Sequence, residues 1–283
     1  MIAQNVITAV LIGIVITGVI PIIGGLILMA AGKIKGSSFW AGVLAYIIAI
    51  VVYAIISGIY TFSTMDMTDL SSVTQNIPTT MVIIMSIISS VIMTISIGIC
   101  IGGCMKLRTF KGAVSCGLGF SAGYLVTAAI SLVSIYFQFV QINSGAFDTM
   151  YRAAIENGML SKDDFNLLKE QIVNVSLSEI LITTINAVLS AILFTSVAIF
   201  IMRGVCSKNT FTGIAVSALI MAAATLPNAI PDTNISTAVS AAISIAALVA
   251  ALTMKGKIVP PQKQVAPDPF LQSVENARQD EEK

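Results

Sequence analysis

The sequence has 283 residues, of which 56% are hydrophobic and only 10% are charged, and its mean hydropathy is +0.94. Soluble globular proteins carry roughly 25% charged residues, so this composition excludes that class and indicates a membrane protein. The formal net charge is +1 and no basic stripe is present, which argues against a nucleic-acid partner. Histidine, the commonest general base and a common metal ligand, is absent. We therefore expect neither a metal centre nor a cofactor.

Seven apolar runs are long enough to cross a bilayer as α-helices, because a hydrocarbon core of about 30 Å requires roughly 20 residues. The first run lacks a basic leading region and is longer than a signal peptide, so we interpret it as a retained span. The sequence predicts an all-α, polytopic domain of about seven transmembrane helices within residues 1–258. The runs cover residues 5–32, 38–62, 80–105, 112–141, 177–202, 211–230 and 234–254. Pro21 and Pro227 lie inside two of the runs and are predicted to kink or end their helices.

Basic and acidic residues alternate from one connection to the next. Basic residues follow the first, third, fifth and seventh runs, for example Lys33, Lys111, Arg203 and Lys255, whereas the other connections carry acidic residues. Cytoplasmic loops of membrane proteins are enriched in Lys and Arg. This distribution predicts an external N-terminus and a cytoplasmic C-terminus.

Two segments are predicted to leave the bilayer. Residues 143–176 resemble an external helical hairpin, because Gly158 is a suitable residue after a helix end and Ser161 with Asp164 resembles a capping pair. This hairpin is interpreted as a lid on the membrane surface or, alternatively, as a docking site for an external partner. Residues 259–283 form a polar, proline-containing tail that is predicted to be disordered in the cytoplasm. A cytoplasmic protein contact is the alternative role for the tail.

The predicted membrane interior contains no charged side chain. Glu179 lies nearest to an exception, in the first turn of the fifth span, where an acidic residue is stabilised by the helix dipole. The polar residues inside include Thr183, Asn186 and Ser190, which can link helices by hydrogen bonds and are weak evidence for a substrate site.

Small residues cluster in the fourth span. Gly119 and Gly123 form a Gly-x-x-x-Gly spacing, and Gly112 lies two turns earlier, so we predict that these glycines allow close packing of helices. Cys100 and Cys104 share one helix face in the third span, and we interpret them as packing residues in preference to a metal or redox pair.

Three patches occur in an order and spacing that resemble a known family. They are Lys111-Gly112-Ala113-Val114-Ser115-Cys116-Gly117-Leu118-Gly119, then Ile142-Asn143-Ser144-Gly145 before the predicted hairpin, then the run from Thr184 to Ile199 with the approach to Pro227. The chain resembles the YhfC family of bacterial membrane proteins, which are classed with glutamic-type intramembrane proteases and are distantly similar to the CAAX-protease group. The resemblance covers most of residues 5–230 and implies a multi-pass protein of the bacterial cytoplasmic membrane.

The catalytic residues of that family are replaced in this chain. The resemblance places the His and Glu of the motif Gly-x-Gly-His-Gly-Gly-x-Glu at Phe120 and Tyr124, and a Glu-Arg pair at Asn186 and Ala187. Two later His positions fall at Phe194 and Met221. Phenylalanine and methionine side chains can neither activate water nor accept its proton. The resemblance therefore implies an inactive relative without catalytic residues, whose core is plugged by apolar side chains.

Three functions from different classes are compatible with these features. The first is a catalytically inactive, helix-binding or structural subunit of a membrane complex, with membrane lipid and a membrane-protein partner or a second copy as its partners. The second is a transporter or channel for a neutral or lipophilic solute, lined by Thr183, Asn186 and Ser190. The third is an active intramembrane protease with non-standard chemistry, for example with Cys116 or Cys104 as nucleophile.

Overall fold

The structure is a computed structural model that describes residues 2–64, 79–103, 108–157, 161–230 and 232–258. These residues form helices and turns without any β-strand, which confirms the all-α prediction. The tail predicted to be disordered, residues 259–283, lies outside the described residues.

Six helical segments are long and apolar enough to cross a membrane, which confirms a polytopic membrane protein. The sixth predicted span, 211–230, corresponds to a helix of 16 residues, α9, which is shorter than the six spanning segments. The helices are α1 (Gln4–Ile14), a π-helix (Val15–Val19), α2 (Ile20–Ala30), α3 (Gly36–Thr64), α4 (Thr79–Gly103), α5 (Phe110–Ser144), α6 (Ala146–Glu156), α7 (Lys162–Val173), α8 (Leu177–Cys206), α9 (Thr210–Thr225) and α10 (Thr233–Leu252), with short 3₁₀ helices at Leu226–Ala229 and Lys255–Lys257.

Both prolines inside the apolar runs interrupt regular α-helix. Proline has no backbone N–H and its ring clashes with the carbonyl four residues earlier. The first span widens into the π-helix Val15–Val19 just before Pro21, and α9 ends at Thr225, two residues before Pro227. Short π-helical segments are a common cause of bends within long helices.

Helix starts are fixed by side chains that accept hydrogen bonds from otherwise unpaired backbone N–H groups. The Ser176 N–H donates to Glu179 Oε2 (2.7 Å), and the Glu179 N–H donates to Ser176 Oγ (3.2 Å), which forms a capping box at the start of α8. Asp232 accepts from the first turn of α10. Glu179 therefore has a structural role at a helix end.

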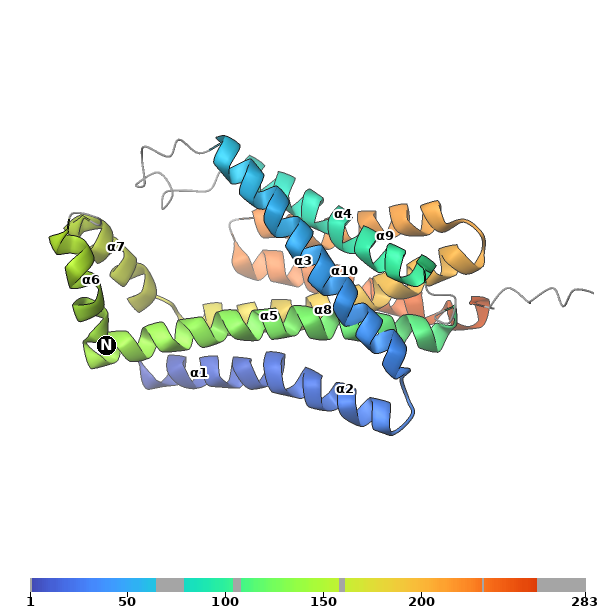
Figure 1. Cartoon of the computed structure of the whole chain (residues 1–283), viewed down its shortest axis with the longest axis horizontal. Coiled ribbons are helices and arrows are strands. Elements are labelled where there is room, and N and C mark those ends of the chain that lie inside the picture. The colour runs from blue at the N-terminus through green and yellow to red at the C-terminus, as the bar shows by residue number, and fades with distance from the viewer. Residues whose placement is uncertain (1, 65–78, 104–107, 158–160, 231, 259–283) are drawn as a thin grey trace, which may run out of the picture.

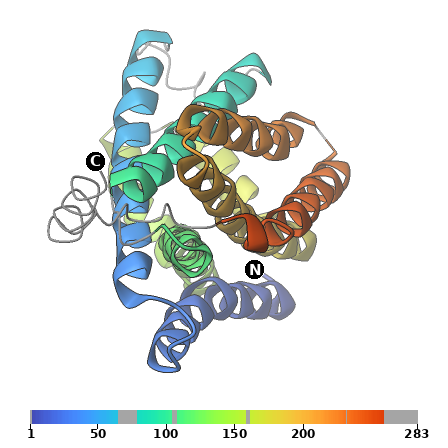
Figure 2. The same cartoon turned by 90° about the vertical axis from the view of Figure 1, so that its right-hand side faces the viewer.

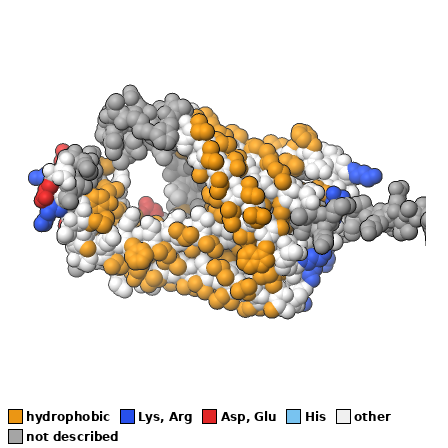
Figure 3. Space-filling model, in the orientation of Figure 1, with side chains coloured by type: hydrophobic (Ala, Val, Ile, Leu, Met, Phe, Trp, Pro, Cys, Tyr) orange, Lys and Arg blue, Asp and Glu red, His pale blue; other side chains and the backbone are white. Residues whose placement is uncertain are grey.

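Helices α5 and α8 run side by side along the length of the molecule (Figures 1 and 2). Segment α1–α2 lies along one side of α5. Helices α3, α4, α9 and α10 pack around the part of the α5–α8 pair that lies away from α6 and α7. The main core lies where these helices meet, and a second cluster joins α1 to α5 and α8 beside the hairpin. In Figure 3 hydrophobic side chains cover the visible flank, whereas charged side chains gather at its two ends.

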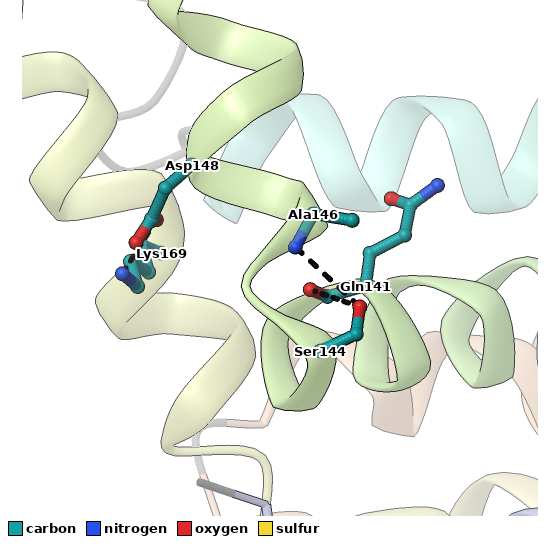
Figure 4. Close-up of polar contacts among 5 residues, drawn as sticks. All are labelled: Gln141, Ser144, Ala146, Asp148 and Lys169. Carbon is teal, nitrogen blue, oxygen red and sulfur yellow. Dashed lines mark hydrogen bonds and ion pairs between the residues drawn. The ribbon is translucent and has the colours of Figure 1, made fainter.

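Helices α6 and α7 occupy the segment predicted as a hairpin. Gly145 adopts a left-handed conformation (φ 77°) that ends α5 and turns the chain into α6. Phe147 is buried and stacks on Phe165 of α7, with ring centroids 5.7 Å apart. An ion pair of 2.6 Å between Asp148 and Lys169 also joins the two helices, as Figure 4 shows. The hairpin is thus held by its own aromatic and ionic contacts.

Candidate functional site

The positions that the resemblance assigned to the first catalytic motif form an aromatic cluster in the core. Phe120 and Tyr124 lie on successive turns of α5, and both rings contact Phe194 of α8, with centroids 5.0 and 5.2 Å away. Edge-to-face arrangements at these distances stabilise aromatic pairs. Phe120 has no exposed surface. Phe120, Tyr124 and Phe194 are therefore adjacent in space, although they lie on two helices that are far apart in the sequence.

A fourth ring, Tyr46 of α3, completes this cluster. Its centroid lies 5.4 Å from that of Phe120, and its hydroxyl donates to Thr127 Oγ1 at 2.9 Å. Sequence reasoning missed Tyr46, because a tyrosine in an apolar run carries no local signal of which neighbouring helix it will meet.

A cavity of about 470 Å³ adjoins the aromatic cluster. Tyr124, Phe194 and Met221 form part of its wall, so it lies at three of the six positions singled out by the resemblance. The Met221 sulfur accepts a hydrogen bond from Thr94 Oγ1 at 3.1 Å, and Met221 is buried. The complete lining is Tyr53, Met81, Val82, Met85, Ser86, Ser89, Met93, Tyr124, Ser190, Leu193, Phe194, Met221 and Thr225.

The cavity wall combines methionines with hydroxyl groups. Four methionines line it, three from α4 and one from α9, together with the hydroxyls of serine, threonine and tyrosine side chains. The lining contains no Asp, Glu, Lys, Arg or Cys. The expectation of a wholly plugged, apolar core is therefore wrong in part. Aromatic rings fill the interior around Phe120, but space with polar groups remains beside Tyr124 because α4 supplies unbranched methionines and small serines there.

The three residues predicted as a polar interior differ in exposure. Thr183, Asn186 and Ser190 follow one face of α8 at spacings of three and four residues. Ser190 lines the cavity and its hydroxyl donates to the Asn186 carbonyl at 2.9 Å. Asn186 is half-buried, and among the described residues its side-chain oxygen has no hydrogen-bond partner. Thr183 is exposed on the surface of α8 and does not line the cavity. Ala187 is buried outside the cavity lining.

The predicted packing glycines lie at the crossing of α3 and α5. A Cβ atom at Gly119 would lie 1.9 Å from the Phe39 carbonyl oxygen, and one at Gly123 would lie 2.6 Å from the Tyr46 ring. Gly42 of α3 faces the Cys116 carbonyl in the same way. Gly112 has a different place, since it lies in the first turn of α5, where its N–H donates to Thr109 Oγ1. The crossing thus positions Phe120 and Tyr124 against Tyr46.

The cysteines form a pair that the sequence did not predict. Cys100 Sγ lies 3.8 Å from Cys116 Sγ of α5 and donates to the Ala41 carbonyl at 3.3 Å. Cys104, the expected companion of Cys100, lies outside the described residues. Within the described part of the chain, no group of three or more Cys, Asp or Glu side chains is placed to hold a metal ion. Cys116 is fully buried, as a packing residue would be.

Comparisons with known proteins add no name to this site: no protein-family model matches the chain, and neither a curated protein nor a solved structure matches it.

Proposed function

We propose that the protein is a non-catalytic relative of the YhfC-like proteases in the bacterial cytoplasmic membrane, and that it binds a transmembrane helix of a partner protein at the cavity. One observation carries the proposal: the cavity of about 470 Å³ is bounded by Tyr124, Phe194 and Met221. These are three of the positions at which the resemblance expects catalytic groups. In this proposal the space for a bound peptide is retained, and the catalytic side chains that would line it are replaced by Tyr124, Phe194 and Met221.

Hydrolysis at this cavity would require an activated water molecule and a group that accepts its proton. The hydroxyls of the wall are weak bases, and the lining residues include no carboxylate, thiol or amine. The resemblance therefore supports recognition at this position and does not support cleavage.

The wall is chemically suited to the side chains of an apolar helix. Methionine is unbranched and flexible, so methionine-lined surfaces adapt to partners of different shape. Met81, Met85, Ser89 and Met93 follow one face of α4 at intervals of four residues. A helix packed along this face would place its side chains in the cavity, and Ser89 could accept a hydrogen bond from a polar group on it.

The described residues around the cavity leave room for such a helix. Figure 3 shows a hollow between α3 and the α6–α7 hairpin, above α5. The C-terminal half of α3 and the first turns of α4 border this hollow, and they also supply Tyr53 and Met81 to the cavity wall. A partner helix could therefore approach from within the membrane plane.

Photo-crosslinking in native membranes tests this proposal. The photoreactive residue p-benzoylphenylalanine replaces Ser89 in the cavity wall or, as a control, Ile48 on the exposed surface of α3. We expect one dominant polypeptide adduct from position 89 and none from position 48, with the crosslinked peptide lying in an apolar segment of the adduct. An adduct with a second copy of this chain would identify a homo-oligomer. The same adducts from both positions, or only lipid adducts from position 89, would contradict the proposal.

A second candidate is the binding and passage of a neutral, lipophilic solute. The cavity volume lies within the range of small-molecule sites, and its hydroxyls could orient a few polar groups. The variant Ser190→Trp would fill this space. Flux of a lipophilic solute into proteoliposomes that is abolished by Ser190→Trp but unaffected by Thr183→Trp, on the exposed turn of the same helix, would favour transport.

A further inference from the structure

A second pocket, separate from the cavity, lies at the C-terminal end of α8. It has a volume of about 220 Å³ and is formed where α8, α9 and the end of α10 meet. Its lining is Phe200, Arg203, Gly204, Ser207, Asn209, Thr212, Gly213, Val216 and Met254. The crossing here is close, because a Cβ atom at Gly204 would lie 2.8 Å from Gly213 Cα. Two glycines thus bring the start of α9 against the last turns of α8.

Arg203 is the charged residue of this pocket, and it lacks a counter-ion among the described residues. Its Nη1 atom is buried and, in the part of the chain that the structure describes, has no hydrogen-bond partner. The one ion pair between described residues joins Lys169 and Asp148 in the hairpin. A buried guanidinium nitrogen without an acceptor is unfavourable. Arg203 also lines the pocket, so an anion bound there would supply the missing counter-ion.

The other polar groups of the pocket also favour an anion. The first N–H groups of a helix lack partners within the helix and carry its positive dipole end. At the start of α9 the Asn209 side chain makes no capping hydrogen bond to them; its Oδ1 accepts from Thr212 Oγ1 instead. Ser207 also lines the pocket, and its hydroxyl donates to the Gly204 carbonyl at 3.1 Å. The groups left to donate to a phosphate are the Arg203 guanidinium and the first N–H groups of α9.

The electrostatic setting points in the same direction. Around this end of the molecule the described charged residues are all basic. They are Lys33, Lys35, Arg108, Lys111, Arg203, Lys208, Lys255 and Lys257. The predicted topology places them at the inner leaflet, where basic pockets between helices bind anionic headgroups.

The apolar residues of the pocket distinguish a lipid from free phosphate. Phe200 and Val216 lie one turn further into the membrane-spanning parts of α8 and α9 than Arg203 and Thr212. Nearby on α9, Phe211 and Leu219 are 82% and 70% exposed, which is compatible with contact to acyl chains. We propose that this pocket binds the phosphate of an anionic phospholipid, with Arg203 and the first turn of α9 on the headgroup and Phe200 and Val216 beside the glycerol and acyl chains. The site is independent of the function proposed for the cavity.

Native mass spectrometry of the full-length protein in detergent tests this site by titration with phosphatidylglycerol and, separately, phosphatidylcholine of the same chains. We expect tighter binding of phosphatidylglycerol. Arg203→Gln should weaken it about tenfold or more, because a charge-assisted contact is lost. Lys257→Gln removes the same charge from the same end outside the pocket, and should change affinity within about twofold.

Three results would overturn the proposal. Equal binding of both lipids by the unmodified protein would remove the preference for an anion. Equal losses in Arg203→Gln and Lys257→Gln would show attraction to the whole basic surface. Displacement of phosphatidylglycerol by inorganic phosphate alone would show that the ligand is a free anion. If Arg203→Gln does not fold, Arg203→Lys keeps the charge without the planar fork and should still bind phosphatidylglycerol more weakly than Lys257→Gln does.

Discussion

Phe120 is fully buried in the core, and its neighbours explain why a catalytic pair could not simply be restored there. Its ring contacts those of Tyr46 and Phe194, and no part of it is exposed. A histidine at 120 and a glutamate at 124 would replace these contacts by polar groups without built-in partners. Buried polar groups destabilise a fold unless they are hydrogen-bonded.

The double variant Phe120→His/Tyr124→Glu should therefore lower stability by about 3 kcal/mol or more and bind no zinc. Thermal unfolding in detergent and zinc content after dialysis measure the two effects. Phe211→His is the matched control, because residue 211 is 82% exposed and should tolerate the change. Stoichiometric zinc in the unmodified protein would refute a non-catalytic core, whereas zinc in the double variant alone would contradict the expectation that these two positions cannot form a metal site.

Asn143 connects the start of the chain to the end of α5. Its Oδ1 accepts from the Ile2 N–H at 2.7 Å and its Nδ2 donates to the Ile2 carbonyl at 3.4 Å. Asn143→Ala should free the N-terminal segment and reduce stability by about 1–2 kcal/mol. Faster amide hydrogen exchange at residues 2–7 would report the change. Ser144→Ala, which alters the neighbouring side chain, should leave that exchange unchanged; equal exchange in both variants would contradict the role of Asn143.

At the scale of elements, the α3–α5 crossing depends on the absence of side chains. Gly119 and Gly42 each face a backbone carbonyl of the other helix at a distance where no Cβ atom fits. Gly119→Val should force the helices apart and abolish or severely reduce the yield of folded protein, since neither backbone can yield locally. Gly58 of α3 has open space around its Cβ position, so Gly58→Val provides the control. Similar yields for the two variants would show that the crossing is looser.

The capping box at the start of α8 gives a smaller effect. Ser176→Ala removes the acceptor for the Glu179 N–H and should reduce stability by about 1 kcal/mol. Glu179→Gln should cost less, because an amide oxygen can still accept from the Ser176 N–H. Thermal unfolding would show which of the two variants is less stable. A larger loss of stability in Glu179→Gln than in Ser176→Ala would contradict the capping role and favour a functional role for the Glu179 carboxylate.

The sequence predicts the helices of this protein better than it predicts which side chains pack against one another. Length and hydropathy located the spans, since each is a property of one continuous segment. The partners of Cys100 and Phe120 depend on how helices rotate against one another, which the weak amphipathicity of lipid-facing helices does not encode. Cys116 and Tyr46 were therefore not foreseen. The short length of α9 could not be predicted for another reason. Its apolar run continues through Leu226, so hydropathy does not indicate that the α-helix ends at Thr225 and that Pro227 lies in a 3₁₀ helix.

For the whole molecule, orientation in the membrane decides which leaflet holds the Arg203 pocket. The described basic residues without acidic neighbours lie at the end of the molecule opposite the α6–α7 hairpin (Figures 1 and 3). Positive charge is retained on the cytoplasmic side during insertion. This end should therefore face the cytoplasm, with the lipid pocket in the inner leaflet and the hairpin outside.

Labelling of intact cells with a membrane-impermeant maleimide tests that arrangement. Glu156→Cys lies exposed on α6 and Lys255→Cys lies exposed after α10. Glu156→Cys should react before permeabilisation and Lys255→Cys only after it, above the background of the native cysteines. The reverse pattern would place the Arg203 pocket in the outer leaflet and the hairpin in the cytoplasm. Labelling of both positions in intact cells would mean that an even number of segments separates them, and α9, with its 16 residues, would then be the helix that does not cross.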